Sequence, residues 1–266
     1  MARLRIGVFD SGVGGLTVVR QLLRLGAEIV CLADTARVPY GNRTPQTVRR
    51  YAFECVSYLV QQGVDLLVVA CNTVSAVALD AVREAAGELP VAEVVTPAVD
   101  AAVEQTQTGH IGVIGTRATI ESGVYERLLK ERGARQVSSR ACPLFVPLVE
   151  EGWYDHPVTE LVAREYLQPL HGVDTLILGC THYPLLLSVL ARVLPGARFV
   201  DSGVALVHWL QRHGWVAADG VQPSALRLLL TDAPTPALEQ MLQALRLDSV
   251  AVQQVCVAEH AFPTGA

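Results

Sequence analysis

Short runs of Val, Ile and Leu alternate along this chain with longer segments in which apolar residues recur at helical spacing. Short apolar runs bounded by turn residues are typical of buried strands, and longer amphipathic segments are typical of helices. The pattern predicts helices over Gln46–Gln61, Tyr125–Arg132 and Val158–Leu170. It predicts strands at Leu4–Phe9, Ile29–Ala33, Leu66–Ala70, Val91–Val95, Ile111–Ile114, Thr175–Leu178, Phe199–Val200 and Leu226–Leu230. Buried strands that alternate with helices indicate an α/β fold with a mainly parallel sheet covered on both faces.

Three strand segments recur later in the chain in the same order, at offsets of 105, 109 and 105 residues. The matches pair RIGVFD at Arg5–Asp10 with HIGVIG at His110–Gly115, VDLLVVAC at Val64–Cys71 with VDTLILGC at Val173–Cys180, and PVAEVV at Pro90–Val95 with PGARFV at Pro195–Val200. Chance could also produce such matches, because buried strands are all built mainly from Val, Ile and Leu. A true repeat is the better explanation, since one match aligns a cysteine with a cysteine. The repetition predicts two similar α/β halves that face each other across a cleft.

Two of the six cysteines follow buried strands directly. Cys71 is followed by Asn72–Thr73 and Cys180 by Thr181–His182, so each thiol precedes a residue that can cap a helix. Ligands bind outside the carboxyl ends of parallel strands, and a helix N-terminus favours a thiolate. We therefore expect both thiols at the cleft. The others are expected to be buried structural residues, as free cysteines usually are: Cys31, Cys55, Cys142 and Cys256.

Several chemistries that use two cysteines fit this chain poorly. A disulfide oxidoreductase usually has a CxxC pair, a zinc site needs three or four ligands, and a thiol hydrolase needs only one cysteine. We expect no metal. Two bases on opposite sides of one carbon suit the removal of a proton from one face and its return to the other, which is the logic of racemisation or epimerisation.

The loop Asp10–Leu23 follows the first predicted strand and opens a helix. It is neither a P-loop nor a dinucleotide-binding GxGxxG, because it lacks the Lys of the first and the third Gly of the second. A tight turn is expected to explain Gly14 and Gly15. A carboxylate at Asp10 would repel phosphate but attract an ammonium group.

Two further segments offer polar groups near the predicted cleft. The loop Ala33–Thr44 contains Asp34, either a turn acceptor or a functional acid, and the Pro39–Gly41 turn. Glu150 and Glu151 follow an apolar stretch, a position that fits either a solvated helix edge or an acid directed at the cleft.

Composition narrows the class further. The chain has 266 residues, 51% hydrophobic and 18% charged, which excludes disorder, collagen and coiled coil. A net charge of -5 gives no broad basic face, so we expect no nucleic-acid partner.

The longest uncharged stretch, Thr175–Ala191, contains Gly, His and Pro, so no membrane role is expected. The early first strand and the cysteine spacing predict a reduced cytoplasmic protein without a signal peptide.

Four motifs carry a specific family resemblance: DSGVGGLTV, ADTARVPYG, ACNTVSA and GCTHYPLL, between Asp10 and about Asp201. In this order and spacing the chain resembles the bacterial glutamate racemases, cofactor-independent members of the aspartate/glutamate racemase superfamily. The resemblance implies interconversion of L- and D-glutamate, a supply of D-glutamate for peptidoglycan, no cofactor and a homodimer. It also implies two pseudosymmetric α/β domains, of residues 1–96 with 207–266 and of residues 97–206.

The resemblance also implies residue roles. Cys71 takes the α-proton of the D enantiomer and Cys180 that of the L enantiomer. Asp10 and His182 assist the respective thiols, and Glu150 supports His182. The implied substrate-binding residues are Asp10, Ser11, Tyr40, Gly41, Asn72, Thr73, Thr181 and His182.

Three alternatives stay open at this point. A pyridoxal-phosphate racemase would need a Schiff-base lysine, and Lys130 is the only lysine in the chain. Another superfamily member would act on aspartate or a related acid. A non-catalytic α/β module would bind an anion and do no chemistry.

Overall fold

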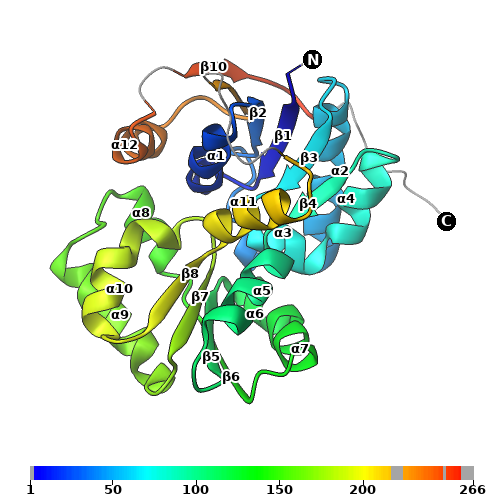
Figure 1. Cartoon of the computed structure of the whole chain (residues 1–266). Coiled ribbons are helices and arrows are strands. Elements are labelled where there is room, and N and C mark those ends of the chain that lie inside the picture. The colour runs from blue at the N-terminus through cyan, green and yellow to red at the C-terminus, as the bar shows by residue number, and fades with distance from the viewer. Residues whose placement is uncertain (1–2, 217–223, 248–249, 259–266) are drawn as a thin grey trace.

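The computed structural model describes residues 3–216, 224–247 and 250–258, and these residues form two parallel sheets with helices around them (Figure 1). The first sheet has the strand order β10-β9-β2-β1-β3-β4. Its strands are β1 (Arg5–Asp10), β2 (Glu28–Ala33), β3 (Leu66–Val69), β4 (Val91–Glu93), β9 (Ala225–Leu230) and β10 (Ala251–Gln254). The second sheet has the order β6-β5-β7-β8, with β5 (His110–Gly115), β6 (Gln136–Ala141), β7 (Thr175–Gly179) and β8 (Arg198–Asp201). The predicted α/β fold with mainly parallel sheets is confirmed.

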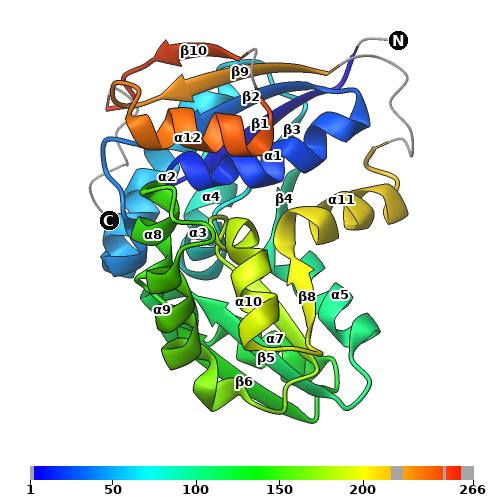
Figure 2. The ribbon, with the colours of Figure 1, turned by 90° about the vertical axis from the view of Figure 1, so that its left-hand side faces the viewer.

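The helices lie on both faces of each sheet. They are α1 (Leu16–Leu22), α2 (Pro45–Val60), α3 (Asn72–Val77), α4 (Leu79–Ala86), α5 (Val95–Gln105), α6 (Arg117–Glu121), α7 (Val124–Glu131), α8 (Phe145–Glu150), α9 (Pro157–Leu167), α10 (Leu187–Val193), α11 (Ser202–Arg212) and α12 (Pro236–Leu245). In Figure 2, the first sheet and its helices lie above the second, and α3 and α8 lie where the two halves meet. None of the helices among the described residues has the length and apolarity needed to cross a membrane.

Two strands of the structure, β6 and β10, were not predicted from the sequence, and both lie at the edge of a sheet. Strand β6 has the sequence QVSSRA with no fully buried residue, and β10 has AVQQ with every residue exposed. An apolar run marks a strand only when both of its faces are covered, so edge strands with polar residues escape that pattern.

The strand order repeats between the halves, since β2-β1-β3-β4 of the first sheet corresponds to β6-β5-β7-β8 of the second. The register agrees for the central pairs: Ile6 lies opposite Leu66 in the first sheet, and Ile111 opposite Thr175 in the second. These positions reproduce the offsets of 105 and 109 residues found in the sequence.

The third sequence match was aligned wrongly. Leu67 pairs with Val91 on β4, and its counterpart Leu176 pairs with Phe199 on β8, which gives an offset of 108 rather than 105. The two segments do form equivalent strands. The sequence alignment, however, matched Pro90 with Pro195, and this shifted the alignment of the two strands by three residues from the structural one.

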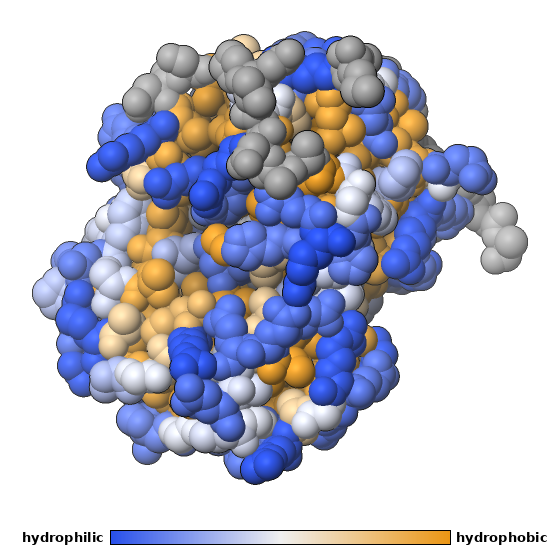
Figure 3. All heavy atoms as spheres, in the orientation of Figure 1, coloured by the Kyte–Doolittle hydropathy of each residue, from blue (hydrophilic) through white to orange (hydrophobic). Residues whose placement is uncertain are grey.

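Apolar packing joins the two halves. One cluster of buried side chains runs from α1, through Leu16 and Val19, to Leu176 and Leu178 on β7 and Leu190 on α10. Figure 3 shows hydrophilic residues over most of one face and hydrophobic residues gathered over α9 and α10. Leu161 of α9 is among the exposed large hydrophobic residues.

Two leucines of the second half, one buried and one exposed, test how much the burial of a side chain contributes to the free energy of unfolding. Leu176 is 0% exposed at the centre of the second sheet, whereas Leu161 is 67% exposed. We expect Leu176→Ala to lower the free energy of unfolding by about 2–5 kcal/mol, because it leaves a cavity in a packed core. The matched control Leu161→Ala should change it by less than about 0.5 kcal/mol. Urea denaturation followed by circular dichroism measures both, and equal effects would contradict this account of the core.

Candidate active site

A cavity of about 420 Å³, called the central cavity below, lies between the two halves. Both sheets direct the carboxyl ends of their inner strands toward it, which is where parallel sheets bind ligands. Ten of the predicted site residues line it: Ser11, Tyr40, Gly41, Cys71, Asn72, Thr73, Glu150, Cys180, Thr181 and His182. The two thiols come from equivalent turns, after β3 and β7, and are 5% and 7% exposed.

The first half surrounds Cys71 with polar groups. The Cys71 Sγ lies 3.3 Å from the Oγ of Ser11. Asp10, fully buried, lies beneath the cavity wall rather than in it, and its Oδ2 accepts hydrogen bonds from the N–H groups of Gly12 (3.2 Å) and Gly15 (3.0 Å). Its Oδ1 has no hydrogen-bond partner among the described residues. The carboxylate therefore keeps one free acceptor close to the cavity.

Burial dominates the charge states on this side. It raises the pKa of Asp10 to about 6, although the charge of His182 and three N–H donors act in the opposite direction. Burial, followed by the charge of Asp10, raises the pKa of Cys71 to about 12. Cys71 is therefore a thiol at neutral pH. The donors next to Cys71 act in the opposite direction, but desolvation outweighs them.

The second half gives Cys180 a different neighbour. The Nδ1 of His182 lies 3.8 Å from the Cys180 Sγ, and its Nε2 lies 3.2 Å from Oε1 of Glu150. Burial opposes the charging of this imidazole, but the contacts with Cys180 and Glu150 outweigh it and raise the pKa of His182 to about 10. His182 is therefore an imidazolium at neutral pH. Of the two adjacent acids, Glu150 lines the cavity and Glu151 is exposed.

The amide of Asn72 is held in one orientation. Its Nδ2 donates to the Oη of Tyr125 (2.8 Å) and to the Oγ of Ser202 (3.2 Å). Its Oδ1 is buried and has no partner among the described residues, so an acceptor remains free beside the cavity. Tyr125 and Ser202 come from α7 and α11, and no sequence motif indicated them.

A cluster of three threonine hydroxyls lies across the cavity wall. The Oγ1 atoms of Thr73 and Thr116 are 2.9 Å apart, and both lie within hydrogen-bond distance of the Oγ1 of Thr119. Sequence reasoning missed Thr116, which lines the cavity. The repeat contained the signal, because Thr116 follows β5 as Ser11 follows β1, at the offset of 105 residues.

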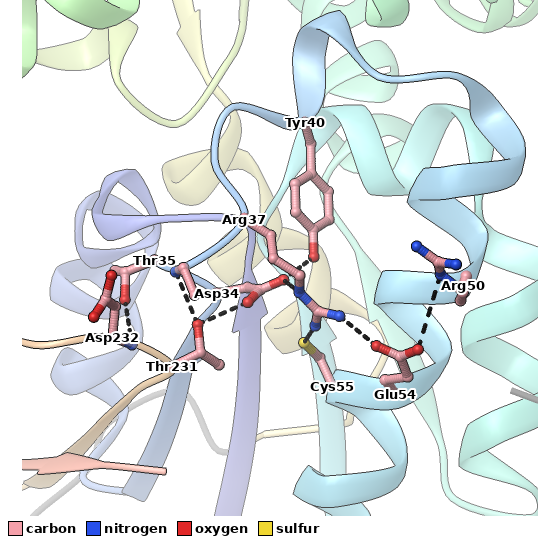
Figure 4. A network of polar contacts seen from close by, with 10 residues as sticks. Asp34, Thr35, Arg37, Tyr40, Arg50, Glu54, Cys55, Thr231 and Asp232 are labelled. Atoms are coloured by element: carbon pink, nitrogen blue, oxygen red, sulfur yellow. Dashed lines mark hydrogen bonds and ion pairs between the residues drawn. The ribbon is translucent and has the colours of Figure 1, made fainter. Parts of the chain in front are cut away.

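The loop that carries Tyr40 is anchored by Asp34 (Figure 4). The Tyr40 hydroxyl donates to Oδ2 of Asp34, which also accepts from Nε of Arg37 (2.7 Å), and Oδ1 accepts from the Oγ1 of Thr231 (2.7 Å). Arg37 also pairs with Glu54. Asp34 is thus a turn acceptor that holds Tyr40 at the cavity and does not itself line it.

The remaining cysteines and the single lysine lie outside the central cavity. Cys31, Cys55 and Cys142 are buried as expected, whereas Cys256 is exposed, so that expectation is wrong. Cys256 follows the edge strand β10, in which every residue is exposed. Lys130 pairs with Glu126 at 2.6 Å on α7, with 62% of its side chain exposed. No group of three or more metal-binding side chains occurs in the described ranges.

The sequence profile of the Asp/Glu/Hydantoin racemase family matches residues 16–210. The chain belongs to this family. It is 51% identical to the glutamate racemase of Persephonella marina over 79% of this chain and 82% of the relative. It is 46% identical to that of Aquifex pyrophilus over 91% of this chain and 94% of the relative. The resemblance seen in the motifs is confirmed, and the chain is an isomerase.

Solved structures of family members agree in fold. The glutamate racemase of Francisella tularensis in complex with D-glutamate has a TM-score of 0.86 at 32% identity, over 97% of this chain and 99% of that one. The enzyme of Thermus thermophilus in complex with β-chloro-D-alanine has 0.83 at 42% identity, over 97% and 98%. An aspartate racemase of Picrophilus torridus, at 16% identity and a TM-score of 0.55, is similar in fold alone.

The pairing of His182 with Glu150 predicts a pH dependence of stability. A histidine whose folded pKa is raised stabilises the folded state fully below about 6.5, and that contribution is lost as the pH rises toward about 10. We expect Glu150→Gln to lower the pKa of His182 and to reduce the loss of stability over this interval. NMR titration of the imidazole and urea denaturation across the interval measure both effects. Glu151→Gln, a change at the exposed neighbouring acid, is the control, and an unshifted His182 pKa in Glu150→Gln would refute the pairing.

Proposed function

We propose that this enzyme interconverts L- and D-glutamate without a cofactor, by proton transfer between the α-carbon and two cysteine thiols. The observation that carries the proposal is the placement of Cys71 and Cys180 at equivalent positions of two repeated halves, both lining one cavity. The curated relatives named glutamate racemase give the substrate. The Francisella tularensis enzyme in complex with D-glutamate supports it.

A two-thiol reaction starts from one thiolate and one thiol, and the position of His182, with its Nδ1 3.8 Å from the Cys180 Sγ, favours Cys180 as the thiolate. The imidazolium of His182 balances a negative sulfur at Cys180, while the pKa of Cys71, raised to about 12, keeps its proton in place. The Cys180 thiolate removes the α-proton of L-glutamate, and the electron pair remains on the α-carbon. Cys71 then gives its proton to the opposite face, which yields D-glutamate. The reverse reaction begins with a thiolate at Cys71 and a thiol at Cys180.

Free polar groups at the cavity match the charges of an amino acid. The unpartnered Oδ1 of Asn72 suits an ammonium group, and the carboxyl group of Asp10 beneath the cavity wall favours a positive charge nearby. Hydroxyl groups of Ser11, Thr73 and Thr116 suit carboxylates, and they stabilise the charge that develops as the α-proton leaves.

The position of Lys130 weakens the pyridoxal-phosphate alternative. A Schiff-base lysine has to reach the substrate, whereas this one is exposed on α7 and paired with Glu126. We further propose that the enzyme is a cytoplasmic homodimer that supplies D-glutamate for peptidoglycan. The proposed domains are residues 1–96 with 207–266, and residues 97–206.

A direct assay tests the substrate. Purified protein without added cofactor should convert each enantiomer of glutamate into the other, followed by chiral chromatography. Aspartate is shorter by one methylene, so its kcat/KM should be lower by about 10–200-fold. Faster turnover of aspartate would favour an aspartate racemase. Failure of solvent deuterium to enter glutamate would favour a binding module, and an absorbance band of bound cofactor would contradict the cofactor-free reaction.

Cysteine variants test the division of labour. Both Cys71→Ser and Cys180→Ser should nearly abolish racemisation, because a serine hydroxyl is much harder to deprotonate than a thiol. Elimination of chloride from 3-chloroglutamate needs only one base, so each variant should keep it with one enantiomer. Cys180→Ser should retain the D isomer and Cys71→Ser the L isomer, measured as release of the 2-oxo acid. Loss of both enantiomers in one variant and of neither in the other would indicate a single base.

A further inference from the structure

The adjacent glycines Gly14 and Gly15 are not explained by the turn they occupy. They belong to the 3₁₀ turn Val13–Gly15 between β1 and α1. Neither is among the glycines with positive φ, and Gly15 has φ -55°, a value open to any residue. The expectation that a tight turn accounts for them is therefore insufficient, because the backbone there does not require glycine.

The reason for glycine at position 14 lies in the other half of the molecule. A Cβ on Gly14 would lie 2.5 Å from Nδ1 and Cε1 of His182 and 2.5 Å from the Oγ1 of Thr181. The threonine hydroxyl can rotate away, but the imidazole is buried and held between Cys180 and Glu150. A methyl group at position 14 would thus displace the ring, including the Nδ1 atom that faces the sulfur of Cys180.

Gly15 makes the corresponding close approach to Asp10 of its own half. A Cβ on Gly15 would lie 2.5 Å from the Cβ and 3.0 Å from the Cγ of Asp10. These atoms form the stem of the side chain, which cannot swing aside, and the Gly15 N–H also donates to Oδ2 of Asp10. A methyl group at position 15 would shift the carboxylate near Cys71.

We propose that Gly14 and Gly15 are positioning residues, each serving one of the two thiols. Gly14 leaves the space that keeps His182 beside Cys180, and Gly15 leaves the space that keeps Asp10 near Cys71. The proposal rests on the proposed two-thiol function. Two neighbouring residues of one turn thereby determine the positions of the groups that assist the thiols on the two opposite faces of the substrate.

A hydrogen bond strengthens the contact between the halves at this point. The hydroxyl of Thr17, on the first turn of α1, donates to the backbone carbonyl of Thr181 at 2.8 Å and to that of Gly14 at 3.0 Å. It ties the glycine turn to the segment that carries Cys180 and His182. Thr17 therefore offers a second way to disturb the same contact without adding volume.

The test is elimination from the two enantiomers of 3-chloroglutamate. In this reaction a thiolate removes the α-proton, chloride leaves with the electron pair of the C–Cl bond, and the enamine product hydrolyses to a 2-oxo acid and ammonia. Gly14→Ala should lower kcat/KM for the L isomer by about 100-fold, the usual effect of misplacing a reacting group by about 1 Å, and leave the D isomer nearly unchanged. Gly15→Ala should do the reverse. Gly7→Ala, which adds a methyl group on β1 against the side chain of Val64, should leave the ratio of the two isomers unaltered.

Each outcome decides between the alternatives. Equal losses for both isomers, or no loss, in Gly14→Ala and Gly15→Ala would overturn the proposal, since a purely structural effect does not distinguish enantiomers. If Gly14→Ala does not fold, Thr17→Val should impair the L isomer selectively and Thr17→Ser should restore it. Absence of that selectivity would overturn the proposal in the same way. Failure of Cys71→Ser and Cys180→Ser to split the isomers would instead refute the proposed function, which keeps the two failures distinct.

Discussion

Parallel strands all end at the same edge of their sheet, and in this chain the edges of two sheets face each other. The residues that follow β1, β3, β5 and β7 are consequently delivered to one shared space. The turns after β3 and β7 bring Cys71 and Cys180 there, and the turn after β1 brings Ser11. Burial raises the pKa of Asp10 and of Cys71, whereas the contacts of His182 with Cys180 and Glu150 outweigh burial and raise its pKa as well.

The two halves share a framework but not their ionisable groups. By the repeat offsets, Asp10 corresponds to Gly115, and His182 corresponds to Thr73. In the proposed mechanism a carboxylate therefore assists one thiol and an imidazole the other, from positions that are not equivalent. The two directions of the reaction start from different enantiomers, so the residues that assist the two thiols do not have to be related by symmetry. The reaction needs only that each thiol can hold and release one proton.

The sequence predicted those parts of the structure that are marked by a short motif, by a run of apolar residues or by the internal repeat. Buried strands, the four motifs and the cavity residues Ser11, Cys71 and Cys180 fall in this class. Thr116 follows β5 as Ser11 follows β1, but it was missed because no motif marked it. Strand β6 was missed because its residues are polar, although it stands 108 residues after β2 in the repeat. Tyr125 and Ser202 were beyond reach for another reason. They touch Asn72 from distant helices, and only the packed fold brings such side chains together.

The anchoring of Tyr40 through Asp34 to Thr231 has a consequence for how the enzyme is made. Thr231 follows β9, late in the chain, whereas Tyr40 and Asp34 belong to its first fifth. A growing polypeptide that already contains both cysteines still lacks the hydroxyl that fixes Asp34 at the base of the loop. The cavity wall is completed only after almost the whole chain has left the ribosome. Synthesis thus supplies the anchor of this loop late, and a chain that ends before Thr231 contains both cysteines but lacks the hydroxyl group that holds this part of the wall.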